Sequence, residues 1–231
     1  MDVSAPHVVI APAGLYLATP VILVSTFNAD DGSNLAPVSS AFWLGRRCVL
    51  GLEASSKTAA NISRTGELVL NLPSEQEAAA IDRLRNLTGM HPVPPAKLVR
   101  GYVSERRKFE AAGLTPVPSR MVAPPRALEC PIQIEATVIN KYGAPPEGVD
   151  WDGAMTLFEV RLELMHVHPE VLTDGDVKRI DPEKWQPLVS TFQNFTGIAQ
   201  GRSGRGRPAR LDLPDRPRNP DRARRSFKIV T

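Results

Sequence analysis

The sequence predicts a mainly β protein of the α+β class, a β-barrel of six to seven antiparallel strands with short peripheral helices. Apolar runs rich in β-branched residues recur between clusters of turn formers, which is typical of strands joined by tight turns. Two later segments alternate between apolar and polar residues, as half-buried strands do. Helical patterns are few and short, which argues against alternating βαβ units.

Four early strands follow from the first observation. The run "PVILVSTF", from Pro20, stops at the turn formers "NADDGSN", and "LAPVSSAFW", "RCVLGLEA" and "ELVLNLP" follow at similar lengths. Residues 3–29 carry no charged side chain, but Pro12, Gly14 and Pro20 interrupt this run. We therefore expect two buried strands joined by a turn there, and no membrane segment.

The alternating segments begin at Pro131 and Leu157. One face of each is apolar and is expected to be buried: Ile132, Ile134, Ala136 and Val138 in the first, and Phe158, Val160, Leu162 and Leu164 in the second. The intervening residues are polar, and we expect them to face solvent. In the first segment they are Gln133, Glu135 and Thr137.

Three short helices are predicted. One spans 74–89, where Ser74 and Glu77 have capping-box spacing, and a second spans 104–113. A third, "TAANISRTG", begins near Thr58 and is expected to end at Gly66. The Pro-rich stretches "HPVPPAK" and "LTPVPSRMVAPPR" are interpreted as connectors that cross the barrel surface.

We expect one domain over residues 1–200 and a basic extension rich in Arg, Pro and Gly over 201–231. The extension has nine Arg and one Lys against three Asp, a net charge of +7 that leaves −4 for residues 1–200. Its composition gives it too little apolar surface to fold alone. Its "GRGRP" resembles the core of an AT-hook, but such a motif arises readily in a tail of this kind, so nucleic-acid binding is not expected.

Polar side chains gather where the strand "RCVLGLEA" gives way to a helix. Ser55, Ser56, Lys57 and Thr58 offer hydroxyl and ammonium donors beside a helix N-terminus, which suits a phosphate. Asn61 lies one turn later and can share that side. The alternative is that a Ser or Thr here only caps the helix.

A second polar group lies in "SNLAPVSSAFW". Asn34, Ser39 and Ser40 lie in and beside a strand whose Pro37 lacks an N–H group, which favours a sheet edge or a bulge. An edge strand leaves backbone donors and acceptors that a flat heterocycle can use. The alternative is an ordinary polar outer face.

Taken in chain order, these blocks resemble the flavin reductase-like family with the FMN-binding split-barrel fold, including flavoredoxins. The resemblance rests on "PVILVSTFN", "SNLAPVSSAFW" and "CVLGLEASSKTAANISRTGELVLNL", followed by "KFEAAGLTP" and "PRALECPIQIEATV", and it covers roughly residues 15–170. It implies a homodimer with FMN, or alternatively FAD, bound near the subunit interface. The implied flavin-binding residues are Asn34, Leu35, Ala36, Pro37, Val38, Ser39 and Ser40 at the ring, Ser55, Ser56, Lys57 and Thr58 at the phosphate, and Asn61 and Asn71 nearby.

The resemblance also implies an NAD(P)H:flavin oxidoreductase that moves hydride from NADH or NADPH to flavin, with a partner oxygenase or another electron acceptor. A flavin-binding electron carrier or storage protein without NAD(P)H activity is the alternative. No catalytic side chain is expected, because the cofactor carries the chemistry. Many family members end with a Gly-Gly and tyrosine segment near the flavin, whereas this chain has "PLVSTFQNFTG", where either Phe192 or Phe195 can take that place.

Metal and disulfide sites are not expected. His166 and His168 lie on one face of a strand, but two ligands are too few for a metal site. Cys48 and Cys130 lie far apart, and neither has a CxxC neighbour. Their spacing argues against a disulfide framework or structural zinc and makes the cytoplasm the expected compartment.

Overall fold

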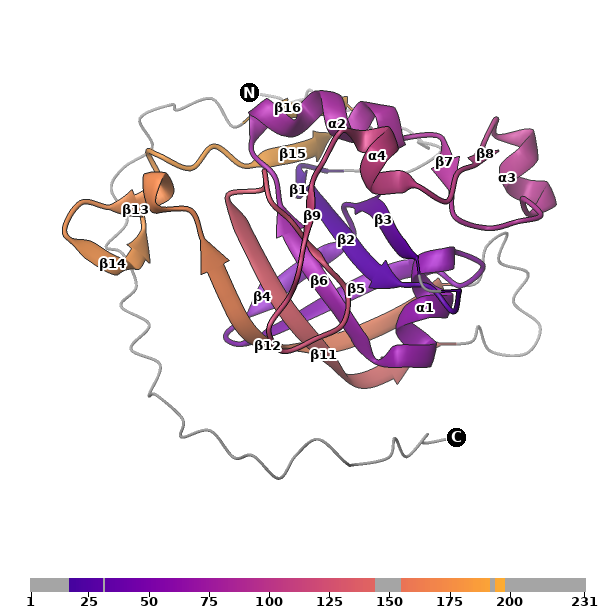
Figure 1. Ribbon diagram of the computed structural model, residues 1–231, viewed down its shortest axis with the longest axis horizontal. Helices are drawn as coiled ribbons and strands as arrows, with labels where there is room; N and C mark the ends of the chain where they lie inside the picture. Colours follow the sequence, from indigo (N-terminus) through magenta and orange to yellow (C-terminus); the bar gives the residue numbers. More distant parts are fainter. Residues whose placement is uncertain (1–16, 31, 144–154, 192–193, 198–231) are drawn as a thin grey trace, which may run out of the picture. The chain divides into compact units, whose positions relative to one another are not determined.

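A seven-stranded antiparallel sheet forms the centre of the protein (Figure 1). The computed structural model describes residues 17–30, 32–143, 155–191 and 194–197. The strand order is β3-β2-β6-β11-β12-β5-β4, which confirms the expected number of strands. These strands are β2 (Ile22–Phe27), β3 (Ser33–Val38), β4 (Ala41–Leu44), β5 (Arg47–Glu53), β6 (Glu67–Leu72), β11 (Ile132–Tyr142) and β12 (Met155–Val167).

The two edge strands of this sheet, β3 and β4, are consecutive in the chain. Only Ser39 and Ser40 join them. The sheet must therefore curl until its edges approach at this link, where Ser40 O accepts a hydrogen bond from Gly51 N of β5 at 2.8 Å. "LAPVSSAFW" was expected to be one strand, and that is wrong, because the chain crosses from one edge to the other within it. The edge position predicted from Pro37 is confirmed.

Strand β2 is buried on both faces, which explains its continuous apolar run. Ile22 and Val24 belong to a cluster inside the curled sheet, together with Leu50, Leu70 and Phe158. Leu23 faces a second cluster, which also contains Leu35, Ile81, Phe109 and Leu188. This second cluster packs helices α2 (Ala78–Leu84) and α4 (Lys108–Ala112) against the outside of the sheet.

The polar residues of β11 correct one expectation. Gln133 and Glu135 were predicted to face solvent, but they are 6% and 0% exposed. The Pro-rich stretch that ends at Arg126 covers them: Glu135 accepts hydrogen bonds from the backbone N–H groups of Arg120 and Met121, and Gln133 Oε1 accepts from Arg126 Nη1. The alternation of apolar and polar residues located the strand. Whether its polar face is exposed to solvent depends on the segment that packs over it.

Two of the three predicted helices are shorter than expected. The segment 74–89 forms a 3₁₀ turn (Glu75–Glu77), α2, and then strand β7 (Leu87–Thr88), which pairs in parallel with β8 (Val103–Ser104). Because Ser104 belongs to this pair, the next helix, α4, begins only at Lys108. Helix α1 (Lys57–Thr65) matches its prediction, with Gly66 as a left-handed C-cap at φ 70°.

One helix was missed altogether. "HPVPPAK" was interpreted as a connector, but α3 (Pro95–Val99) begins there with Pro95 in its first turn. Figure 1 shows α3, β7 and β8 together at one end of the layer that contains α2 and α4.

Small elements complete the described chain: β1 (Thr19–Pro20), β9 (Pro116–Val117), β10 (Arg126–Ala127), a 3₁₀ turn (Pro169–Val171), β13 (Leu172–Thr173), β14 (Asp176–Ile180), β15 (Leu188–Thr191) and β16 (Asn194–Gly197). No helix among the described residues is long and apolar enough to cross a membrane. The expected strand before β1 and the basic extension lie outside the described residues.

Candidate functional site

A cavity of about 640 Å³ opens beside the link between the two sheet edges. Its volume lies within the range of about 300–1,000 Å³ that is usual for small-molecule sites. We call one side the barrel wall: Val21, Asn34, Ala36, Pro37, Val38, Ser39, Ser40, Gly51, Leu52, Glu53, Ser56, Lys57 and Thr58. We call the other the helical wall: Leu84, Arg85, Asn86, Leu87, Thr88, Lys97, Arg100, Tyr102 and Lys108. Ser190 and Phe195 complete the lining.

The first turn of α1 forms a polar cradle at the base of the barrel wall. Ser56 is the N-cap, and its Oγ accepts a hydrogen bond from Ala59 N at 3.1 Å. Ser56 therefore caps the helix, as the alternative interpretation expected, and it also lines the cavity. Lys57 and Thr58 follow in the first turn, where backbone N–H groups lack acceptors within the helix and carry partial positive charge.

The structure brings most of the predicted site residues together. Asn34, Ala36–Ser40 and Ser56–Thr58 all line the cavity. Four others lie outside its lining. Leu35 is in the apolar cluster beneath α2, and Ser55 is exposed and donates to Glu53 Oε1 at 2.8 Å.

The remaining two, Asn61 and Asn71, are buried and hydrogen-bonded within the protein. Asn61 Nδ2 donates to Asn28 Oδ1 at 2.8 Å and to Thr26 Oγ1 at 3.0 Å. Asn71 Nδ2 donates to Leu23 O, and its Oδ1 accepts from Ala127 N. Their side chains join strands and loops behind the barrel wall.

Asn34 has a buried, unsatisfied acceptor beside the cavity. Its Nδ2 donates to Thr58 Oγ1 at 3.0 Å, which ties β3 to α1. Its Oδ1 is buried and has no hydrogen-bond partner among the described residues. A buried polar atom without a partner is costly, so a ligand that donates a hydrogen bond here would stabilise the site.

Gly89 marks how closely the two walls approach. A Cβ atom at this position would lie 2.7 Å from Asn34 Oδ1 and 3.0 Å from Lys57 Cγ. A side chain here would therefore displace both groups of the barrel wall. The glycine was expected to end a helix, but it instead follows β7, where its lack of a side chain keeps the cradle open.

The helical wall carries most of the positive charge. Arg85, Lys97, Arg100 and Lys108 all come from the segment that runs from the end of α2 to the first residue of α4. Glu53, at the end of β5, faces two of them: Lys97 Nζ lies 3.7 Å from its Oε2 and Arg100 Nη2 lies 3.3 Å from its Oε1. Burial alone would raise the pKa of Glu53, but the hydrogen bond from Ser55 and these two charges outweigh it and lower the pKa.

The Lys108 side chain is buried in the helical wall. The residue is 3% exposed, and its Nζ donates to Leu87 O at 3.0 Å. Burial, with a smaller contribution from the charge of Lys97, lowers its pKa to about 8. Its charge is therefore sensitive to pH near neutrality.

Sequence reasoning missed all four of these cations. Arg85 and Lys108 lie in segments predicted as helices, Lys97 ends a stretch interpreted as a connector, and Arg100 lies where no element was predicted. None of the four belongs to a recognisable motif. The signal that could have found them is the pair Pro94–Pro95, since proline is favoured in the first turn of a helix and would have placed Lys97 and Arg100 on one short helix.

Of the two aromatic residues considered near the C-terminus, Phe195 lines the cavity, and the guanidinium of Arg85 lies 5.0 Å from its ring centre. Phe192 is outside the described residues.

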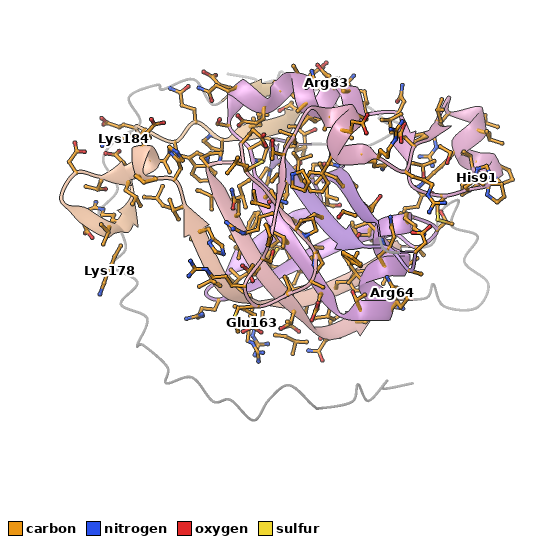
Figure 2. The ribbon with its side chains drawn as sticks, in the orientation of Figure 1. Arg64, Arg83, His91, Glu163, Lys178 and Lys184 are labelled. Atoms are coloured by element: carbon orange, nitrogen blue, oxygen red, sulfur yellow. The ribbon has the colours of Figure 1, made fainter. Side chains whose placement is uncertain are left out.

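The two histidines considered as metal ligands do not line the cavity. His166 Nε2 is 2.7 Å from Glu135 Oε1, and His168 Nδ1 accepts from Glu170 N. Lys178, on the β13–β14 hairpin, lies well away from α1 (Figure 2).

A family model described as "Flavin reductase like domain" matches residues 14–198. The chain belongs to this family. It is 35% identical over 191 residues to the uncharacterized protein YdfE of Bacillus subtilis (strain 168), a match that covers 83% of this chain and 89% of that protein. The recognition made from the sequence blocks is thereby confirmed.

Solved structures support the fold. The chain is similar to flavoredoxin of Desulfovibrio vulgaris (Miyazaki F), with a TM-score of 0.68, 20% identity, and coverage of 86% of this chain and 96% of that one. It is also similar to nitrilotriacetate monooxygenase component B from Bacillus cereus, with a TM-score of 0.67, 21% identity, and coverage of 87% and 100%. The predicted split barrel is confirmed, and family membership supports a flavin-related redox function.

The lining residues fit a flavin nucleotide. The barrel wall offers the polar edge of β3 and the unsatisfied Asn34 Oδ1 to a heterocycle that has both donors and acceptors. The cradle at Ser56–Thr58 offers hydroxyls, an ammonium and helix-terminal N–H groups to a phosphate.

Proposed function

We propose that the protein binds FMN in this cavity and acts as an NAD(P)H-dependent flavin reductase. The observation that carries the proposal is the pairing of two unlike surfaces in one cavity, a neutral strand edge at Asn34–Ser40 and a phosphate cradle at Ser56–Thr58. A flavin mononucleotide has a matching flat heterocycle and a single phosphate. When bound, it supplies the redox chemistry by accepting a hydride, that is two electrons and a proton, from the nicotinamide, which leaves as NAD(P)⁺.

The side chains of this protein bind and orient. Asn34 is fixed by its hydrogen bond to Thr58, so that its Oδ1 can accept from the ring system while Thr58 stays beside the phosphate. Lys57 neutralises phosphate charge from the first turn of α1. Phe195 and Arg85 line the cavity next to each other, and in this proposal they limit the entry of water.

We also propose that the active form is a homodimer. Phe42 and Leu44 of β4 are 60% and 80% exposed, and Tyr142 and Met155 are also exposed. Strand register puts them on the outer face of β4, β5, β11 and β12, which also carries the Arg47–Glu159 ion pair. Exposed large apolar side chains that gather on one face usually mark an interface. A Cβ at Gly51 would lie 3.2 Å from Met155 Sδ, so this face borders the cavity.

One sample tests the reductase proposal. Protein purified without added flavin is examined by absorbance, titrated with FMN, freed of oxygen and mixed with NADH or NADPH. We expect saturable FMN binding and loss of the yellow flavin absorbance on adding the nucleotide. Protein that is colourless as purified and shows no saturable change in flavin absorbance or fluorescence during the FMN titration would exclude flavin binding. Holoprotein that stays yellow would exclude the reductase activity and leave a flavin carrier.

The homodimer is tested by sedimentation. We expect a mass twice that of the 25.2 kDa chain, and a shift toward the single-chain mass in Phe42→Glu, which places a charge opposite the apolar Val49 on this face. Val177→Glu is the matched control, because Val177 is also exposed but lies on β14. A wild-type protein that sediments as a monomer at high concentration would contradict the proposal.

A further inference from the structure

The cavity has a second cationic corner that the phosphate cradle does not use. Lys97 and Arg100 come from α3 and the residue after it, and Tyr102 lies just before β8. The Tyr102 ring has both charges near it, with Lys97 Nζ at 5.8 Å and the Arg100 guanidinium at 5.5 Å from its centre. All three residues line the cavity.

Lys97 lacks the hydrogen bonds that a buried ammonium needs. The residue is only 6% exposed. Its ion pair with Glu53 is 3.7 Å long, beyond hydrogen-bond distance, and Nζ has no acceptor among the described residues. An anionic ligand that accepts a hydrogen bond from Nζ would therefore stabilise the corner.

Contacts to part of the Arg100 guanidinium fix its orientation. Its Nε donates to Ala96 O at 3.2 Å, and its Nη2 lies 3.3 and 3.4 Å from the two oxygens of Glu53. Within the described part of the chain these contacts leave Nη1 with its two donors. The side chain is 52% exposed, so a ligand can reach it. Glu53 thus fixes the orientation of the Arg100 guanidinium but leaves some of its N–H donors for a ligand.

Charge in the cavity exceeds what one phosphate can balance. Five basic side chains line it, Lys57, Arg85, Lys97, Arg100 and Lys108, against the single acid Glu53. A phosphate monoester carries a charge of about −1.5 to −2. After FMN occupies the cradle, an excess of positive charge therefore remains on the helical wall, in the corner around Tyr102.

We propose that Lys97, Arg100 and Tyr102 form a second subsite that binds the 2′-phosphate and adenine of NADPH, so that the protein prefers NADPH to NADH. This rests on the proposed function. A 2′-phosphate is a monoester, and its charge matches two cations better than the singly charged phosphates of a pyrophosphate do. The planar guanidinium can bind that phosphate, and the flat Tyr102 ring can stack on adenine.

The test measures binding rather than turnover. FMN-loaded protein is titrated with 2′,5′-ADP and with 5′-AMP by calorimetry, in the wild type, Arg100→Gln and Tyr102→Leu. We expect wild type to bind 2′,5′-ADP about 10–100-fold more tightly than 5′-AMP, the value of one or two charged hydrogen bonds. Arg100→Gln should lose most of that preference. Tyr102→Leu should weaken both ligands and keep the ratio.

Arg179→Gln is the control, because it removes the same charge from the exposed strand β14. It should behave as wild type, and FMN binding by each variant confirms that the variant is folded. Kinetics with both nucleotides add a second readout: in Arg100→Gln the loss should appear as a higher KM for NADPH.

Several results would overturn the inference. One is equal affinity of the wild type for 2′,5′-ADP and 5′-AMP. Another is a variant Arg100→Gln that loses thermal stability but keeps its affinity for 2′,5′-ADP, which would make the Glu53 pair only an anchor for α3. A third is tighter binding of FAD than of FMN, by an increment that Arg100→Gln removes, which would assign the corner to adenosine of the flavin itself. Failure to bind FMN at all would instead refute the proposed function.

Discussion

The two walls of the cavity are built from different kinds of residue. On the barrel wall, sheet geometry positions a row of mostly neutral groups, with Asn34 and Thr58 hydrogen-bonded to each other and Lys57 as the one cation. On the helical wall, short elements carry four cations, and two of these are 6% exposed or less. The first wall suits a neutral heterocycle with one phosphate, whereas the second suits further anionic groups.

This difference suggests that the two walls bind different ligands. The seven-stranded sheet fixes the barrel wall, so the flavin position should vary little among proteins with this fold. The helical wall depends on two helices of only five residues each, α3 and α4, and on the short strands β7 and β8, which have two residues each. Changes there can alter which second ligand is accepted while the sheet stays the same.

The largest effect is expected at the one cation of the barrel wall. Lys57→Met should weaken FMN binding by about 10–100-fold, because a charged hydrogen bond to phosphate is worth about 1.5–3 kcal/mol. Flavin fluorescence titration measures this. Lys178→Met is the matched control, since it makes the same change on the β13–β14 hairpin (Figure 2). An unchanged affinity in Lys57→Met would place the phosphate elsewhere.

A smaller effect, confined to the helical wall, should depend on pH. The pKa of Lys108 is about 8, so its charge is present below that pH and lost above it. Affinity for FMN should therefore fall a few-fold as pH rises through about 8, a range in which the phosphate charge is constant because its own pKa is near 6. Lys108→Met should bind more weakly at low pH and give a flat profile in the same titration.

Unfolding cannot mimic this result. Because the pKa of Lys108 is lowered by folding, the unfolded chain holds the proton longer, and the contribution of this group to stability increases as pH rises from about 8 toward 10.5. Affinity and stability should thus move in opposite directions. A wild-type affinity that does not change across this range would show that Lys108 does not contribute to binding.

The barrel wall could be predicted from sequence because local patterns determine it. β-Branched runs located β2, β5 and β6, Pro37 indicated an edge strand, and the polar stretch before Gly66 gave both the cap and the cradle of α1. Even there, local pattern could not reveal that Leu35 points into the apolar cluster beneath α2, or that Asn61 and Asn71 have partners in neighbouring strands.

The helical wall could not be predicted, because tertiary contacts determine it. Leu87 and Thr88 leave a helical pattern to pair with Val103 and Ser104, which no periodicity within either segment indicates. The burial of Lys97 and Lys108 likewise depends on where α3 and α4 dock. Charged residues in a Pro-rich stretch resemble any solvated loop until that docking is known.

The Ser39–Ser40 link has a consequence for engineering. Two residues span the gap between the sheet's outermost strands, so lengthening this link would let the barrel open and would change the flavin side of the cavity directly. The segment from Arg85 to Arg107 has no such constraint, because none of its residues belongs to the seven-stranded sheet. A chimera that exchanges this segment for one of different charge, with a glycine kept at position 89, should leave the barrel wall intact and change which second ligand the cavity accepts.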